Sequence, residues 1–482
     1  MQLEWGFRAI TNCHPIHTHQ VNLMSRTHFD SNSIEATSDR LTGRAGIAGF
    51  AQYIETMGLP DKMAETFPNL KKSKKGIGTK DFFASTLCWL MNGESRHLSS
   101  FDDLKEDDTS TALFNVDEVP SSDAVKRMFK KFGQSHEYGF REVLSGLFMR
   151  KLLTVKPKVV ILGVDSMVMD NDDANFRMGV SPTYKKCKGF HPLQMTWMGM
   201  IIDATFRAGS RSTHEFKGTY KMIKRMVKRV RESLGHDTAI IIRMDAGYCD
   251  EKLIRCLDEE LKVGFQIGGK LYKNFKADIA AIPEENWNEY SSGSRSWKYL
   301  EMGYKCASWK NYYRAILTQV DSREDGTLFL EFARPTSLII TNIGRSSNIF
   351  SPSAKEHVQK YMETESQIEL YQGRGAEELC HRGLKDFGFE QLPFKQFGAN
   401  LAMYHCMLIG FATFELFKSE ILVDVVSPTS YATTVRRKFI DIAAKVTTSG
   451  NKIYLKLREI TLKRVQFKEV WWRCFNTPPL IV

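Results

Sequence analysis

A short segment, residues 371–385, places four polar side chains at spacings that could serve one chemical site. It reads YQGRGAEELCHRGLK and contains Tyr371, Arg374, Glu378 and Lys385. An α-helix advances by about 100° per residue, so one continuous helix would put all four on a stripe about 60° wide. A carboxylate between cations on a helix face could form a surface salt-bridge ladder. The same set could instead supply a metal ligand flanked by phosphate contacts.

Two aspartates stand out because each belongs to an apolar strand segment. Asp165 lies inside VVILGVDSMV, and Asp245 directly follows AIIIRM and precedes a glycine turn. A buried carboxylate is costly unless it is paired or bound to metal, and α/β sheets place their chemistry at strand ends. Asp165, Asp245 and Glu378 could therefore hold two hard divalent cations through oxygen ligands. Two such cations are the usual arrangement for in-line phosphodiester chemistry.

Each of these carboxylates also has a purely structural interpretation. Asp165 could cap a turn or pair with a buried lysine, and Asp245 could be the N-cap of the helix that follows. Glu378 could pair with Arg374 and Arg382, as helical neighbours do. The spacing alone leaves these alternatives open.

The segments around the aspartates predict a mixed α/β sheet. Runs rich in β-branched residues predict a strand at 158–169, a strand or hairpin at 194–206, and strands at 238–244 and 263–269. Residues 214–235 predict a long amphipathic helix. Its basic face would carry Lys217, Lys221, Lys224, Lys228 and Arg231. This order of strands and helices is typical of a sheet buried on both faces.

The rest of the chain predicts four further regions around this pattern. Helical spacing of apolar residues predicts a helical N-terminal domain over residues 1–155. Short strands predict a β-rich insertion at 273–345, between two parts of the core at 156–272 and 346–430. Residues 431–482 form a basic C-terminal segment, to which the sequence gives no clear role.

The composition favours a polyanionic partner. The chain has 482 residues, a net charge of +11 and a pI near 9.0, which favours nucleic acid over a membrane. Nine cysteines without a CxxC pair argue against a disulfide framework and a thiolate zinc site, and fit a reducing cytoplasm. The start of the chain does not resemble a signal peptide. The longest apolar run, residues 401–414, contains His405 and predicts a buried helix rather than a membrane span.

The spacing Tyr-x2-Arg-x3-Glu-x6-Lys resembles the signature of a large group of bacterial insertion-sequence DDE transposases. The settings of Asp165 in GVDS and Asp245 in RMDAGY are similar to those of the first and second Asp of that group. The resemblance covers roughly residues 40–460. It implies an RNase H-like mixed-sheet catalytic core, a β-rich insertion before the catalytic Glu, and a helical N-terminal DNA-binding domain.

The resemblance also implies roles for individual residues and an activity. Asp165, Asp245 and Glu378 would be the catalytic metal ligands, and Tyr371, Arg374 and Lys385 would contact DNA phosphates. The metal would be two Mg²⁺ ions, with Mn²⁺ able to substitute. The expected reaction is excision and strand transfer of an insertion sequence at terminal inverted repeats, by phosphodiester hydrolysis and transesterification. The partners would be double-stranded DNA and a second copy in the DNA complex, without a membrane, in the nucleoid-associated bacterial cytoplasm.

Two alternatives remain beside this expectation. One is an RNase H-like nuclease, or a domesticated transposase, that cuts DNA without integrating it. The other is a DNA-binding protein whose acidic triad is structural. Some relatives stack a flipped base on an aromatic of the insertion, for which Trp297 and Trp309 are candidates here unless they are core residues.

Overall fold

The computed structural model describes residues 34–71, 75–174, 176–211, 215–292, 295–320, 336–344, 349–450 and 452–480. Arg40–Val482 form one compact unit, distinct from Met1–Asp39. Residues 1–33 of the predicted N-terminal domain and residues 321–335 of the predicted insertion lie outside the described residues.

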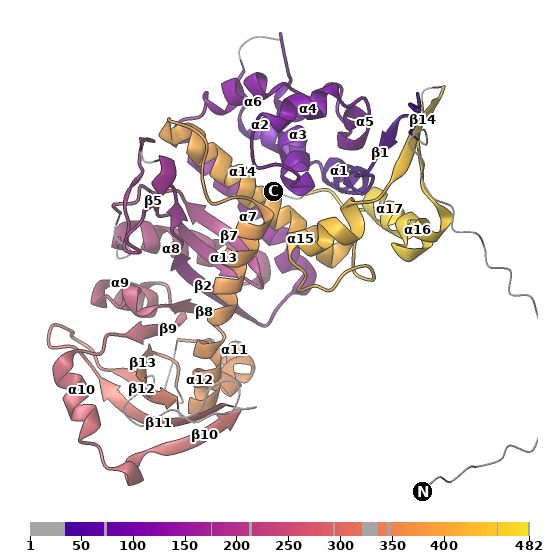
Figure 1. Ribbon diagram of the computed structural model, residues 1–482. Coiled ribbons are helices and arrows are strands. Elements are labelled where there is room, and N and C mark those ends of the chain that lie inside the picture. Colours follow the sequence, from indigo (N-terminus) through magenta and orange to yellow (C-terminus); the bar gives the residue numbers. More distant parts are fainter. Residues whose placement is uncertain are drawn as a thin grey trace, which may run out of the picture. The chain divides into compact units, whose positions relative to one another are not determined.

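A nine-stranded sheet runs through the compact unit, in the order β10-β11-β12-β13-β9-β8-β2-β6-β7 (Figure 1). Its strands are β2 (Val159–Ser166), β6 (Leu193–Trp197), β7 (Met200–Thr205), β8 (Ala239–Met244), β9 (Gly264–Gly269), β10 (Asn288–Ser292), β11 (Arg295–Tyr304), β12 (Tyr313–Val320) and β13 (Thr336–Thr341). Strands β2, β8 and β9 run parallel, whereas β6 pairs antiparallel with β2 and β7. The sheet is therefore mixed, as the sequence predicts.

The predicted strand or hairpin at 194–206 is a hairpin. Met198 and Gly199 connect β6 to β7 with positive φ angles of 45° and 78°. Two consecutive residues with positive φ make the tight turn that suits the twist of paired strands.

The strands predicted as an insertion continue the central sheet. Strand β13 pairs antiparallel with β9, and β12, β11 and β10 follow outward in turn. Ile339 and Ile340 point to opposite faces of β13 and belong to different apolar clusters. The insertion therefore shares a continuous hydrogen-bonded sheet with the strands that carry the aspartates.

Strand β8 shows how the two faces of the sheet are covered. Ile240 and Ile242 belong to the large core that includes the buried side of α8 (Phe216–Leu234). Ala239 and Ile241 belong to a separate cluster with α11 (Pro352–Val358) and Leu370 of α12 (Thr364–Gln372). Because side chains alternate along a strand, Arg243 of β8 points to the same side of the sheet as Ala239 and Ile241, the side covered by α11 and α12.

Helices of the N-terminal region pack against one long apolar helix, α14 (Phe397–Glu420). The N-terminal helices are α1 (Ile47–Thr56), α2 (Leu59–Thr66), α3 (Thr79–Asn92), α4 (Ser100–Glu106), α5 (Ser110–Phe114), α6 (Ser122–Phe129) and α7 (Glu137–Val155). By length and composition α14 could cross a membrane, yet 89% of its apolar window is buried inside the protein. The prediction of a buried helix over residues 401–414 is confirmed.

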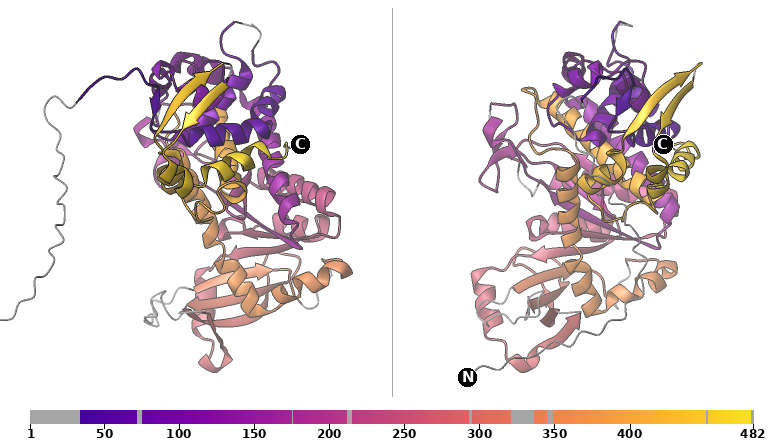
Figure 2. Two further views of the ribbon diagram at one scale, coloured as in Figure 1. Left: turned by 90° about the vertical axis from the view of Figure 1, so that its right-hand side faces the viewer. Right: turned by 45° about the vertical axis from the view of Figure 1, so that its right-hand side comes forward.

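The basic C-terminal segment packs against the N-terminal helices (Figure 2). It contains α15 (Ala432–Val435), β14 (Ala444–Ser449), β15 (Lys452–Lys456), α16 (Glu459–Arg464) and α17 (Phe467–Phe475). Strand β14 pairs with β1 (Leu41–Thr42), and α17 packs on α1. The backbones touch, because a Cβ added at Gly46 would lie 1.9 Å from the carbonyl oxygen of Phe439. The segment thus completes the helical region instead of forming a separate tail.

Candidate active site

Asp165 is the penultimate residue of β2, and Asp245 directly follows β8, its parallel neighbour. Val164 of β2 is level with Met244 of β8, so the next residue of each strand is one of the aspartates. Oδ1 of Asp165 accepts a hydrogen bond from the Ser166 amide at 2.7 Å. Oδ1 of Asp245 accepts one from the Gly247 amide at 2.8 Å. Each aspartate therefore has one oxygen fixed by the backbone and a second that can face a ligand.

The structural interpretations of these aspartates hold only in part. Asp245 does cap a helical turn, but the turn is the short 3₁₀ segment Ala246–Tyr248, and Asp250 caps the following helix, α9 (Glu251–Arg255). Within the described residues, Asp165 has no lysine partner. A capping role at one oxygen is compatible with metal binding at the other.

The segment that carries the predicted signature is broken into two helices. Helix α12 ends at Gln372 and α13 (Gly375–Phe387) begins three residues later, so the single helix that would place all four side chains on one stripe is not formed. Gly373 and Gly375 flank the break, and glycine lowers helix stability by about 1 kcal/mol relative to alanine. Tyr371 consequently lies on α12, while Glu378 and Lys385 lie on α13.

Glu378 is exposed on the first turn of α13. It has no ion-pair partner in the described part of the chain. Arg374 lies over the ring of Tyr371, at 5.8 Å, and Arg382 lies over the ring of Tyr431, at 5.6 Å. The salt-bridge ladder considered for this segment is therefore not formed among these residues.

The three carboxylates lie in one another's electrostatic field. The pKa of Asp165 is raised to about 6, first by burial and then by the charges of Asp245 and Glu378, against the Ser166 amide and Arg374. Burial alone would lower the pKa of Arg374, but Tyr371 and the two aspartates outweigh it and raise the pKa. Such clustering of like charges around one cation is a feature of functional sites.

The donor set suits a hard divalent cation. Asp165, Asp245 and Glu378 offer only carboxylate oxygens, which Mg²⁺ and Mn²⁺ prefer. In the residues that the structure describes, however, no three His, Cys, Asp or Glu side chains surround a single point. The strand ends thus bring the two aspartates together, and Glu378 would have to approach them to complete a metal site.

Tyr371 and Lys385 occupy different environments. The Tyr371 hydroxyl packs against the end of β9, where a Cβ added at Gly268 would lie 2.5 Å from it. Lys385 forms an ion pair with Glu390. Contact of either residue with DNA phosphates remains a prediction.

Sequence reasoning missed two charged residues beside the carboxylates, Arg243 and Glu377. Arg243 of β8 donates hydrogen bonds to Glu377 Oε1 at 2.9 Å and to the Leu370 carbonyl at 2.8 Å. Because Glu377 is on α13 and Leu370 is on α12, Arg243 connects both helices to the sheet. Glu377 is only 4% exposed, and burial raises its pKa to about 7 against the attraction of Arg243. The signal in the sequence was a single arginine within the apolar strand AIIIRM.

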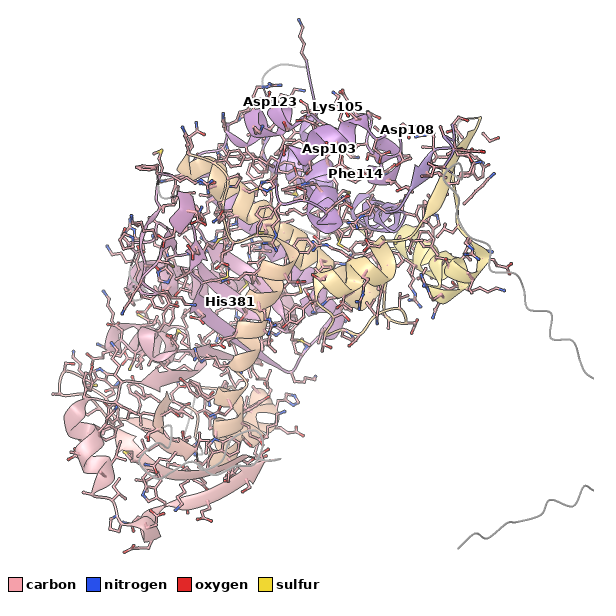
Figure 3. The ribbon with its side chains drawn as sticks, in the orientation of Figure 1. Asp103, Lys105, Asp108, Phe114, Asp123 and His381 are labelled. Carbon is pink, nitrogen blue, oxygen red and sulfur yellow. The ribbon has the colours of Figure 1, made fainter. Side chains whose placement is uncertain are left out.

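His381 lies on α13 one turn beyond Glu378 (Figure 3). Burial lowers its pKa to about 4, and the charges of Lys185 and Lys385 act in the same direction. Two lysines from different elements therefore converge near this neutral imidazole.

The aromatic candidates of the insertion are core residues. Trp297 and Trp309 are 5% and 7% exposed. Trp297 stacks on Tyr290, and Trp309 packs edge-on against Tyr304 and Tyr313. The core-packing interpretation is therefore correct for both.

The predicted basic face of α8 is largely exposed. Lys217, Lys221, Lys224 and Lys228 face solvent along one side of the helix. Arg231 is partly buried and donates to the Lys262 carbonyl at 2.9 Å. The exposed lysines form a basic stripe of the kind that binds nucleic acid phosphates.

Comparison with known proteins identifies the family. The sequence matches the family described as Transposase DDE domain group 1 over residues 28–478. No curated protein matches the sequence. The cryo-EM structure of the piggyBac transposase synaptic complex with hairpin DNA is similar at 12% identity and a TM-score of 0.39, over 92% of this chain and 87% of that chain, which is too low to indicate shared function. Because the family match spans most of the chain, the protein belongs to the DDE transposase family and is an enzyme of DNA transposition.

Proposed function

We propose that this transposase excises an insertion sequence at its terminal inverted repeats and joins it to target DNA. The carrying observation is that Asp165 and Asp245 lie at the carboxyl ends of adjacent parallel strands, and that the charge of the α13 residue Glu378 reaches Asp165. Water would cut the element's end to leave a 3′ hydroxyl, which would then attack phosphodiester bonds in the target. Both steps are in-line displacements at phosphorus and need no covalent link between protein and DNA.

An RNase H-like core is part of this proposal. Five neighbouring strands of the sheet lie in the order β7-β6-β2-β8-β9. The first three in sequence, β2, β6 and β7, are antiparallel neighbours, and β8 and β9 then add in parallel on the other side of β2. This arrangement places the first aspartate on the central strand and the second on its parallel neighbour, which supports the proposed core.

The metal site would consist of Asp165, Asp245 and Glu378. Two bound Mg²⁺ ions, or Mn²⁺ in their place, would activate the attacking oxygen and stabilise the leaving oxygen. The backbone bonds to Oδ1 of each aspartate would hold Oδ2 in a fixed orientation toward the ligand. Glu378 would complete the set through its exposed side chain on the first turn of α13, a turn that Arg243 connects to β8 through Glu377.

Double-stranded DNA would be held by polar and basic side chains on two surfaces of the protein. Tyr371, Arg374 and Lys385 would contact phosphates close to the cut, and the charges of the two aspartates already act on Arg374. The exposed α8 lysines would add contacts without sequence preference. We also propose that two copies act together on paired ends, as part of a bacterial insertion sequence working on the nucleoid in the cytoplasm.

The test is cleavage of linear DNA carrying the gene's own flanks, with and without Mg²⁺. Wild type should cut at a defined end only with the cation, whereas Glu378→Gln should bind the DNA but not cut it. The matched control is Glu459→Gln, an exposed glutamate in the first turn of α16 that pairs with Lys463, and it should cut like wild type. Equal cutting by Glu378→Gln would overturn the metal-ligand assignment.

A supercoiled target plasmid in the same reaction separates transposition from the alternatives. Joining of the cut ends to the plasmid supports strand transfer. Cutting without joining favours a nuclease or a domesticated transposase. Binding that needs neither Mg²⁺ nor the three carboxylates favours a DNA-binding protein.

A further inference from the structure

The two-stranded ribbon of β14 and β15, in the C-terminal segment, carries its cations on one of its two faces. Side chains alternate along a strand, and residues directly opposite each other share a face. Three opposite pairs make up this face: Lys445 with Lys456, Thr447 with Tyr454, and Ser449 with Lys452. The face therefore presents three ammonium groups, two aliphatic hydroxyl groups and one phenol, and it contains no carboxylate.

The opposite face of the ribbon is apolar and holds the ribbon to the protein. Val446 is 2% exposed, Ala444 is 7% exposed, and Leu455 packs against the large core. The other edge of β14 pairs with β1, and the Val446 amide donates to the Arg40 carbonyl at 2.9 Å. Figure 2 shows both strands lying outside the N-terminal helices. The ribbon is thus fixed from behind, and its basic face is directed away from the body.

The basic face is accessible and belongs to a strongly basic segment. Lys452, Tyr454 and Lys456 are exposed. In the part of the chain that the structure describes, Lys452 and Lys456 have no ion-pair partner, whereas Lys463 of α16 is paired with Glu459. Residues 431–482 contain eleven Lys and Arg but three Asp and Glu, in a chain whose net charge is +11. This segment therefore contributes most of the net positive charge of the protein.

The spacing of the lysines along the ribbon fits the major groove of duplex DNA. A strand advances by about 3.4 Å per residue, so Lys452 and Lys456 lie about 14 Å apart along β15. The major groove of B-form DNA is about 12 Å wide and admits a two-stranded ribbon. Lysines at the two ends of the ribbon would then reach phosphates on both rims of the groove. The central pair, Thr447 and Tyr454, would lie over the base edges between the rims.

We propose that the β14–β15 ribbon enters the major groove of duplex DNA at the terminal repeat. Its lysines bind phosphates on the two rims, and Thr447 and Tyr454 contact base edges. This inference rests on the proposed function and adds a third DNA surface to the two already proposed. Hydroxyl groups both donate and accept hydrogen bonds, which suits the pattern of donors and acceptors that distinguishes base pairs in the major groove. Phosphate contacts position the ribbon, whereas base contacts give it a preference for one sequence.

The first test measures how strongly the affinity for DNA depends on salt. The probe is a labelled duplex of the gene's own flanks, bound to the full chain without divalent cation so that no bond is cut. We expect Lys452→Ala/Lys456→Ala to lower the slope of log affinity against log salt by about two, one for each lost phosphate contact. The matched control is Lys355→Ala/Lys360→Ala, which removes two exposed lysines of α11 and of the turn that follows it. The control should keep the wild-type slope.

The second test identifies the groove that the ribbon occupies. Dimethyl sulfate methylates guanine N7, an atom that lies in the major groove. Wild type should protect guanines within the bound duplex, and Lys452→Ala/Lys456→Ala should lose protection that the control variant keeps. An RNA duplex of the same sequence should bind more weakly, because the major groove of A-form RNA is too deep and narrow for side chains to read. Equal binding of the RNA duplex would overturn the major-groove contact.

The third test measures base reading as the ratio of affinities for the terminal repeat and for a scrambled duplex. Thr447→Val/Tyr454→Phe removes both hydroxyl groups and keeps the size of both side chains. We expect this variant to lower the ratio about tenfold while the salt slope stays unchanged. A wild-type ratio in this variant would show that the two hydroxyl groups do not read the sequence.

The outcomes separate this inference from the proposed function. If wild type cuts DNA with Mg²⁺ while Lys452→Ala/Lys456→Ala keeps the slope and the protected guanines, the ribbon contact is wrong and the proposed function stands. If the slope and the protection depend on the ribbon but wild type does not cut, the ribbon contact stands and the proposed function fails. If the protein does not bind the DNA duplex at all, both are wrong.

Discussion

Asp165 is the residue at which opposing forces in the site are clearest. Its position on the central strand partly buries it, and this burial with two nearby carboxylates raises its pKa to about 6. The Ser166 amide and Arg374 oppose that rise, so the carboxylate is poised to lose its proton near neutral pH. A divalent cation would relieve the repulsion that keeps the proton in place. The cost of burying Asp165 is thus the reason why the site would attract metal.

Metal binding by the free protein should therefore depend on pH. Because the folded pKa of Asp165 is raised to about 6, the ionised form that binds metal is lost as the pH falls below that value. A ligand must be deprotonated to bind, so we expect Mn²⁺ affinity to fall by about tenfold per pH unit below pH 6. Titration calorimetry at several pH values between 5 and 7.5 measures this.

The control for that prediction is Asp165→Asn, which cannot lose a proton. It should bind Mn²⁺ weakly at every pH and show a flatter profile. Affinity of the wild type that stays constant from pH 5 to pH 7.5 would contradict the role of Asp165.

At the scale of elements, the position of Glu378 depends on how closely α13 approaches β2. The carboxylate of Glu377 lies directly over Gly163, where an added Cβ would come within 2.1 Å of Oε1. Arg243 holds that carboxylate and also the Leu370 carbonyl, which fixes the end of α12 and the start of α13. Gly163 is required here because only a glycine leaves room for a buried ion pair above the strand.

Gly163→Ala should therefore both destabilise the protein and impair cutting. Overpacking at a buried site costs about 1–3 kcal/mol, and the displaced Glu377 would carry the first turn of α13 away from the aspartates. Urea unfolding and the cleavage rate measure the two effects. Gly303→Ala is the control, because a Cβ on this other strand glycine meets only Tyr312, at an ordinary 3.9 Å. A Gly163→Ala protein as stable and active as Gly303→Ala would show that the close approach is unimportant.

At the scale of the molecule, local patterns in the sequence predicted elements better than their distant contacts. The strands around Asp165 and Asp245, the helix over 214–235 and the buried helix over 401–414 follow from periodicity, which local sequence contains. The break between α12 and α13 depends on glycines whose effect competes with the helical pattern around them. The pairing of β13 with β9, and of β14 with β1, joins segments far apart in the chain, which periodicity cannot indicate.

One buried carboxylate, Asp203 on β7, connects the sheet to two helices, α7 and α8. It is 0% exposed and accepts hydrogen bonds at 2.8 Å from Arg141 of α7 and Arg225 of α8. Burial alone would raise the pKa of Asp203, but the two arginines outweigh it and lower the pKa below its usual value of 3.8. Its ionised form is therefore part of what holds α7 and α8 to the sheet.

Asp203→Asn should cost about 3–5 kcal/mol of unfolding free energy at pH 7, because it leaves buried arginine charge without a partner. A lowered folded pKa means that this stability is present above pH 3.8 and is lost as the pH falls through the folded pKa. The variant should therefore lose less stability than wild type between pH 4 and pH 2. Asp424→Asn, which removes a half-exposed partner of Arg473, should cost less than about 1 kcal/mol and keep the acid response of wild type. Equal urea midpoints for the two variants at pH 7 would show that Asp203 does not fix the helices to the sheet.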